Sequence, residues 1–258
     1  MLSLLGVIVV ARDQIFVGVA VSQASTLGIA LAMWASGFFL ELSWLDQPPV
    51  LSLFGIIFAI LATLVTSRCV KRSGRASPES VTGFVYLFAA SFSLLLLSQS
   101  PHGLEEIHRL LTSTIIGATS ADVWVFLVLD LVAIVMLYVW SDGLRLILMD
   151  SEVAAAHGLK VWLWNITTTA LMGLAIGMAI RVSGMLYVSG CLVLPALAAS
   201  RLCSELGKMF FVAPVIFLAS SLPAYVLAYH YDCPPGQMVV FVMAVISGLL
   251  AIWSRARK

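Results

Sequence analysis

The stretch "IFVGVAVSQASTLGIALAMWASGFFLE" (15–41) contains no charged residue before its last position. A helix of about 20 apolar residues crosses the hydrocarbon core of a bilayer, and this run is long enough. The whole chain has the same character: 61% of its 258 residues are hydrophobic and 10% are charged. Because a soluble domain is about half apolar and about a quarter charged, the composition predicts an all-α, polytopic membrane protein.

Further apolar runs predict a bundle of about eight transmembrane helices. They cover roughly 15–41, 49–69, 82–99, 123–141, 162–180, 184–200, 209–229 and 236–253. Residues 1–11 are too few to span, so we expect the end of a helix whose start is missing, or a short buried segment. The connections reach only about twenty residues, which is too short for a soluble domain, and 1–258 is predicted to be one transmembrane domain.

The distribution of Lys and Arg predicts the orientation of these helices. If residue 258 is cytoplasmic and the spans alternate, all but Arg109 and Arg181 of the 14 basic residues fall on the cytoplasmic side. Basic residues favour the cytoplasmic side of membrane proteins. We therefore expect a multi-pass protein of the cell inner (plasma) membrane with a cytoplasmic C-terminus.

Polar residues within the first span are candidates for a translocation path. Gly18 and Ser22 are small, and small residues let helices approach closely in lipid. Gln23 is longer and costly to bury unpaired, so it must meet a polar partner or a watery cavity. Thr26 follows on the same helical stripe as Val19 and Gln23. Helix packing and a polar pathway both remain open here.

The segment "SGMLYVSGCLVLPALAASRL" (183–202) is expected to form an interrupted helix. Gly184, Gly190 and Pro195 lie within it. Transporters often use broken helices at binding sites, and neighbouring helices or cavities satisfy the freed backbone groups. A kinked helix that serves packing alone is the other interpretation.

The inner segment "MDSEVAAAHGLKV" (149–161) predicts a short cytoplasmic helix. Asp150 or Ser151 can cap its start, Glu152 and Ala154 lie within it, and Gly158 can end it. Such a helix between two spans can dock a cytoplasmic partner, or it can be an ordinary linker.

A weak metal-site candidate lies in the predicted outer segment 100–122. His102 and Glu106 are four residues apart and Glu105 and His108 three apart, so either pair can share a helix face and bind a divalent ion. A solvated loop is the competing interpretation. The chain has no GxxxxGK[ST] phosphate loop, so any ATP that drives it must bind to another chain.

Five segments, taken in order, resemble the membrane permeases of ABC-type importers for zinc, manganese and iron. They are "FVGVAVSQASTLGIAL" (16–31), "LLTSTIIGATSADVW" (110–124), "DSEVAAAHGLKV" (150–161), "SGCLVLPALAASRL" (189–202) and "YDCPPGQMVV" (231–240). The resemblance covers nearly the whole chain. It implies a dimer of identical or different permeases, a separate cytoplasmic ABC ATPase that binds the ATP, and an extracytoplasmic metal-binding protein.

The same resemblance assigns roles to individual residues. It implies that Asp150, Glu152, Ala154 and Gly158 couple the permease to the ATPase. It implies a translocation path that includes the residues of the first span and of the interrupted helix: Gly18, Val19, Ser22, Gln23, Thr26, Gly190 and Pro195.

The chain departs from the family pattern at the expected metal ligands. The family signature F-x-G-D-A-L-S-H-A has aspartate and histidine four residues apart, where this chain has Val19 and Gln23. Valine cannot bind a metal, and a neutral amide oxygen is a weak ligand for Zn²⁺ or Mn²⁺. This leaves three possibilities: a second permease that carries the ligands, a metal that passes without tight coordination, or another cargo.

The sequence thus predicts a permease subunit of an ATP-driven importer for divalent metal ions, without a catalytic site or a cofactor of its own. An ATP-independent secondary carrier and a polytopic membrane enzyme are the alternatives. A carrier usually shows internal repeats and more intramembrane charges, and an enzyme needs a cluster of acids, histidines or a nucleophile. Nucleic acid is not an expected partner.

Overall fold

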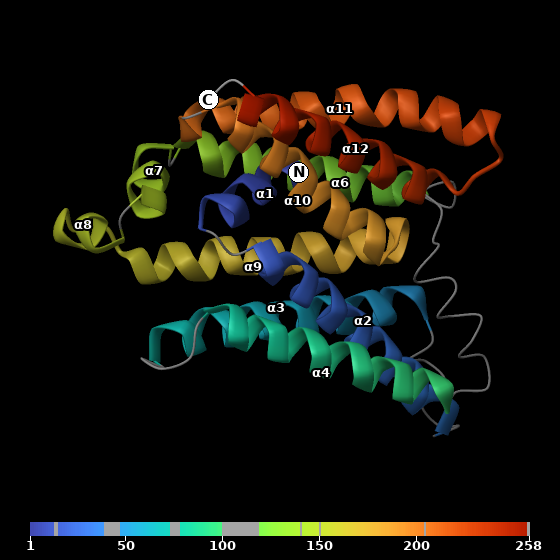
Figure 1. Ribbon diagram of the computed structural model, residues 1–258. Helices are drawn as coiled ribbons and strands as arrows, with labels where there is room; N and C mark the ends of the chain where they lie inside the picture. The colour runs from blue at the N-terminus through green and yellow to red at the C-terminus, as the bar shows by residue number, and fades with distance from the viewer. Residues whose placement is uncertain are drawn as a thin grey trace. The chain divides into compact units, whose positions relative to one another are not determined.

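The computed structural model describes residues 1–12, 15–38, 47–72, 78–99, 119–139, 141–149, 151–203 and 205–256. Every regular element in these ranges is an α-helix (Figure 1). The helices are α1 (Leu2–Ala11), α2 (Ile15–Phe38), α3 (Pro48–Arg72), α4 (Pro78–Ser98), α6 (Ser120–Val139), α7 (Ser141–Met149), α8 (Ser151–Ala156), α9 (Val161–Ser183), α10 (Met185–Leu202), α11 (Leu206–His230) and α12 (Pro235–Ala256).

Within the described residues, seven helices are long and apolar enough to cross a membrane: α2, α3, α4, α9, α10, α11 and α12. Most of the remaining predicted span, 123–141, lies in α6, which ends at Val139 and is not among these seven helices. The predicted all-α bundle is therefore confirmed. Residues 1–11 form a short helix, as expected, and Ser3 and the five residues from Leu5 to Val9 are buried.

The chain divides into two compact units, which we describe separately. One contains Phe16–Ser113 and Thr168–Val188, so it includes α2, α3, α4 and most of α9. Its helices approach closely at glycines. A methyl group added to Gly28 of α2 would lie 2.5 Å from the carbonyl oxygen of Phe54 in α3. Methyl groups added to Gly173 and Gly177 of α9 would lie 3.0 and 2.8 Å from the Cα atoms of Ile60 and Ile56 in α3, so α9 also approaches the backbone of α3 closely.

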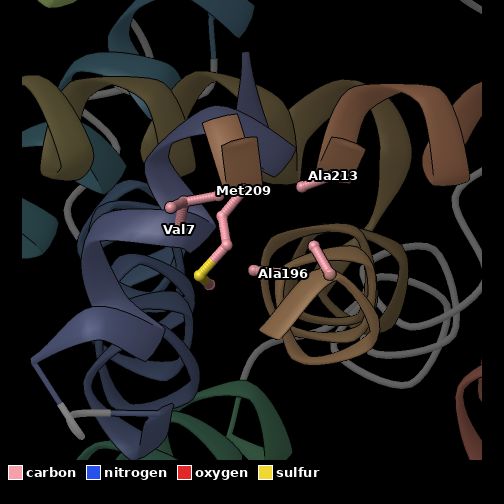
Figure 2. Close-up of a cluster of buried hydrophobic side chains, with 5 residues drawn as sticks. Val7, Ala196, Met209 and Ala213 are labelled. Carbon is pink, nitrogen blue, oxygen red and sulfur yellow. The ribbon is translucent and has the colours of Figure 1, made fainter. Parts of the chain in front are cut away.

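The other unit contains Met1–Ile15, Thr114–Thr167 and Ser189–Lys258. Its core is a buried cluster between α1, α10 and α11, formed by Val7, Ala196, Ala199, Met209 and Ala213 (Figure 2). The side chain of Met209 extends among the small residues of the other two helices. Gly6 of α1 lies against the carbonyl oxygen of Leu192 in α10, and a methyl group there would be only 1.8 Å from that oxygen.

Large apolar side chains are exposed on the outer faces of the spans. Phe211 and Tyr229 of α11 are 75% and 92% exposed, and α4 carries a stack of Phe84, Phe88 and Phe92. Such exposure is unfavourable in water and favourable in a bilayer, where the surrounding lipid is apolar. The arrangement therefore fits helices embedded in a membrane.

Candidate translocation path and coupling helix

The hydroxyl groups of the α2 polar stripe are largely satisfied by their own helix. Ser22 Oγ donates to the carbonyl oxygen of Val19 at 2.8 Å, and Thr26 Oγ1 donates to that of Ser22 at 3.1 Å. Hydroxyls that bond to the preceding turn present little polarity to their surroundings. Ser22 and Thr26 can thus lie on a helix surface that faces lipid or protein, because burying their hydroxyl groups costs little free energy.

Two faces of α2 have different neighbours. Ser25 faces α3, because a methyl group on Gly55 would lie 2.9 Å from Ser25 Oγ. Ser25 Oγ is buried and has no hydrogen-bond partner among the described residues. Thr26 instead approaches the start of α10, with Thr26 Oγ1 at 3.9 Å from Met185 Sδ. The Ser25 face is thus a helix seam.

Gln23 lies on the same stripe as Thr26 and Val19, away from the α3 seam. The residue is only 9% exposed, and its amide atoms are not among the fully buried side-chain atoms that lack a hydrogen-bond partner. An amide is costly to bury unpaired, so the largely buried Gln23 is the longest polar group that this stripe can offer to water, a further chain or a passing cargo. Gln23 is the clearest indication of a polar path on α2.

The predicted interruption of 183–202 occurs at one point rather than three. Gly184 adopts a φ of 78°, which favours glycine, and it separates α9 from α10. α10 then continues through Gly190 and Pro195. Expecting a break at those two residues was wrong, since membrane helices tolerate proline where neighbours satisfy the backbone. Ser247 of α12 donates to the carbonyl oxygen of Leu194 at 3.2 Å, so α12 is bonded to α10 one residue before the proline.

Gly190 has a packing role. A methyl group at this position would lie 2.7 Å from Val240 Cγ2 of α12, so the glycine allows α12 to approach α10. Gly190 and Pro195 belong to the unit that contains α12, whereas the candidate residues of α2 belong to the other unit. The contacts within each unit do not join these two groups into one site.

The predicted cytoplasmic helix is α8, and its end follows the predicted pattern. Gly158 has a φ of 80°, its N–H donates to Ala155 O, and the Leu159 N–H donates to Ala154 O. These two bonds form a Schellman motif, in which glycine is the favoured residue. His157 Nδ1 lies 2.9 Å from Val153 O. Ala154 is buried, whereas Val153 is 41% exposed and is the larger apolar side chain available to a partner.

Several predicted site residues lie outside the described part of the chain. They are His102, Glu105, Glu106, His108 and Asp150, together with the side chain of Glu152. In the ranges that the structure describes, no group of three or more His, Cys, Asp and Glu residues could hold a metal ion.

One helix was not predicted from the sequence. Residues 141–149 form a separate helix, α7, which packs against α6, α8 and α1. The spacing of its buried residues Leu144 and Ile147 was the available signal. The Asp130 carboxylate of α6 lies 2.5 Å from the backbone nitrogen of Met1, at the start of α1.

Comparison with known proteins identifies the family. The model of the ABC 3 transport family matches residues 1–254. The chain belongs to the ABC 3 transport family.

Individual family members are distant in sequence. The manganese transport system membrane protein MntC of Halalkalibacterium halodurans is 21% identical over 251 residues, 97% of this chain and 81% of that protein. The high-affinity zinc uptake system membrane protein ZnuB of Buchnera aphidicola is 24% identical over 246 residues, 94% of this chain and 88% of that protein. This ABC 3 chain is thus similar to metal-transport membrane proteins along nearly all of its length.

A solved structure shows the same fold. A chain of PsaBC from Streptococcus pneumoniae in complex with Fab superposes with a TM-score of 0.77 at 18% identity, covering 96% of this chain and 85% of that chain. This ABC 3 protein therefore has the fold of that PsaBC chain, and its family and its apolar helices make it a multi-pass membrane permease.

Proposed function

We propose that this chain is the permease subunit of an ATP-driven importer for a divalent metal ion such as zinc, manganese or iron. It acts as one permease domain over 1–258 in the inner membrane, with its C-terminus in the cytoplasm. Family membership and the names of the relatives support the metal cargo. The distribution of Lys and Arg supports the orientation.

The Gln23 stripe of α2, with Gly18, Val19, Ser22 and Thr26, is the proposed lining of the path. The observation that carries this assignment is Gln23, a long polar residue that is only 9% exposed within a transmembrane helix and lies on the side of α2 away from the α3 seam. Neutral oxygen ligands hold a transition-metal ion more weakly than carboxylate and imidazole. A metal therefore passes this stripe with part of its hydration shell, or with ligands from a second permease. Gly190 and Pro195 are proposed to shape the path from α10.

The chain is proposed to work without a catalytic site or a cofactor, in complex with partners. A cytoplasmic ABC ATPase binds ATP and docks on α8, where Val153 is exposed beside Ala155 and Ala156. Asp150 and Glu152 complete this docking segment, and Ala154 and Gly158 hold its shape. A second permease completes the path, and an extracytoplasmic metal-binding protein delivers the ion to the outer side.

The test is uptake of zinc and of manganese by vesicles that contain the chain with its ATPase. Gln23→Leu should lower uptake at least about tenfold, the cost of about 1.4 kcal/mol on the barrier. Ser25→Ala is the matched control, because Ser25 lies two residues away on the α3 seam and its hydroxyl has no described partner. Unchanged uptake by the Gln23→Leu protein would remove α2 from the path.

Two further measurements concern the metal ligands that Val19 and Gln23 do not supply, and the dependence of uptake on ATP. The double variant Val19→Asp, Gln23→His places a carboxylate and an imidazole four residues apart, and the purified protein should bind Zn²⁺ more tightly than the unmodified protein does. Disabling the phosphate-loop lysine of the ATPase should abolish uptake. Uptake that persists in that variant would show an ATP-independent carrier instead.

A further inference from the structure

The side chain of Met185 meets the polar stripe of α2 at Thr26. Met185 Sδ lies 3.9 Å from Thr26 Oγ1, and both residues belong to the same compact unit. Thr26 is buried and Met185 is half-buried, so the methionine is the more accessible of the two. The stripe that is proposed to line the path therefore has a thioether from α10 beside it.

A turn fixes the backbone on which Met185 stands. Gly184, with its positive φ, ends α9, and Met185 is the first residue of α10. The Gly184 N–H donates to Ile180 O at 2.9 Å, and the Val188 N–H donates to Gly184 O at 3.2 Å. The methionine side chain on this backbone still has three rotatable bonds, so its sulfur can adjust its position to a bound ion.

The contact between Thr26 and Met185 brings together two atoms with available electron pairs. The Thr26 hydroxyl has a single proton, and its shorter bond is the one to the carbonyl oxygen of Ser22, at 3.1 Å. When the proton points to Ser22, no proton of Thr26 stands between the Thr26 oxygen and the Met185 sulfur. Two such electron-pair donors side by side suit a cation.

The separation of these two atoms is close to that of two ligands on one metal ion. A Zn²⁺ ion binds oxygen at about 2.1 Å and sulfur at about 2.3 Å, which places the two ligand atoms about 3.6 Å apart at a tetrahedral angle. The observed 3.9 Å therefore needs only a small movement of the methionine side chain. Gln23 is the neighbour of Thr26 one turn earlier on the helix surface and adds an amide oxygen.

The chemistry of these side chains determines which ions they favour. All of them are neutral, since residues 15–38 and 182–200 contain no Asp, Glu, Lys, Arg or His. Thioethers favour thiophilic ions such as Cu⁺ and Zn²⁺, whereas Mn²⁺ prefers carboxylate, carbonyl and water oxygens. A thioether beside the path thus favours a thiophilic ion over Mn²⁺.

We propose that Met185 is a metal ligand of the path, beside Thr26 and Gln23, and that it makes the path selective for thiophilic ions over Mn²⁺. The proposal rests on the proposed function, because it takes the α2 stripe as the lining of the path. It deepens that function by naming the class of metal ion and the residue of α10 that recognises it.

The test compares uptake of Cd²⁺, a thiophilic divalent ion, with uptake of Mn²⁺ by vesicles that contain the full chain with its ATPase. Met185→Leu keeps the apolar volume and removes the sulfur, so the ratio of Cd²⁺ to Mn²⁺ uptake should fall at least about fivefold. A role in packing alone would change the uptake of both ions equally. Met243→Leu is the matched control, because Met243 of α12 is only 1% exposed and therefore closed to an ion.

A second measurement detects the ligand without transport. When the four cysteines are replaced by alanine, methionine is the only source of sulfur in the purified chain. The X-ray absorption spectrum of Cd²⁺ bound to this protein should show a sulfur neighbour, and Met185→Leu should remove it. A spectrum without a sulfur neighbour, or one that keeps it in the Met185→Leu protein, would overturn the proposal.

Gln23→Leu separates a failure of the path from a failure of this proposal. If Gln23→Leu leaves the uptake of both ions unchanged, α2 does not line the path, and the role of Met185 fails with the proposed function. If Gln23→Leu lowers uptake but Met185→Leu leaves the ratio of Cd²⁺ to Mn²⁺ unchanged, only the metal ligand is overturned, and the contact of Met185 with Thr26 serves packing.

Discussion

Gly6 and Gly158 show two different reasons why a membrane protein needs glycine. At Gly6 the reason is space, because the α10 backbone occupies the place of a side chain. At Gly158 the reason is backbone conformation, since φ is positive and there is open space around the Cα. The two reasons predict different effects when each glycine is replaced by alanine.

Gly6→Ala should destabilise the protein by about 3 kcal/mol, because the new methyl group would overlap a backbone oxygen that cannot move aside. The measurement is the temperature at which the detergent-solubilised protein loses its monodisperse size-exclusion peak. Gly83→Ala in α4 is the control, since nothing lies within 4 Å of the added methyl group. Equal thermal stability of both variants would contradict the close approach of α1 to α10.

Gly158→Ala should loosen the end of α8 by about 1 kcal/mol, since a left-handed conformation is costly for a residue with a Cβ. Hydrogen exchange of the peptide that covers residues 151–160 should then be about five times faster. Gly158→Asn should show a smaller increase, because asparagine tolerates this conformation. Exchange that is equally fast in all three proteins would mean that Gly158 does not hold α8.

For single residues, a signal within a few neighbouring positions can be read from the sequence. Gly158 was predicted to end a helix because a glycine that follows a short helical segment is such a signal. The sequence could not separate packing from pathway at Gln23, because the answer depends on which helices surround the amide. Met185, which approaches Thr26, is 159 residues away in the chain and carries no local signal.

At the scale of helices, α9 and α3 meet along a seam of small residues. Methyl groups at Gly173 and Gly177 would lie 3.0 and 2.8 Å from the Cα atoms of Ile60 and Ile56. Glycines four residues apart form one groove on a helix. In lipid the hydrophobic effect does not drive helices together, so close packing in such grooves is what makes the helices associate.

Gly177→Ala should therefore lower stability by about 1–3 kcal/mol, and Gly173→Ala by somewhat less, since its clearance is larger. Thermal unfolding in the same detergent measures both. Gly248→Ala in α12, where the added methyl group meets nothing within 4 Å, should leave the transition unchanged. A shift in the control as large as that of Gly177→Ala would argue against a specific α9–α3 seam.

Most helices were predicted because a membrane span needs a long apolar run. The predicted 209–229 and 236–253 lie within α11 and α12. α7 was missed because it is short and its polar start, Ser141 and Asp142, looked like a loop. The break falls at Gly184, where φ is 78°, and α10 continues through Pro195. The residue types alone do not decide this, because a membrane helix tolerates proline where its neighbours satisfy the backbone.

For the whole molecule, the cysteines provide a test of orientation. Cys203 precedes α11 and Cys233 follows it, so a helix of 25 residues, about 37 Å long, separates them. With the predicted orientation, a membrane-impermeant maleimide should label the exposed Cys233 in intact cells and reach Cys203 only after permeabilisation. Cys233→Ser should remove the first label. Labelling of Cys203 in intact cells would reverse the topology.

The distribution of residue sizes has a consequence for how such proteins diverge. Alanine and glycine form the helix seams, whereas many large aromatic and aliphatic side chains face outward. Lipid accepts almost any apolar side chain, so replacements can accumulate on the outside of the molecule while the seams stay fixed. Overall identity therefore understates the structural likeness of distant members. Searches that weight the spacing of small residues should recover relatives that average similarity overlooks.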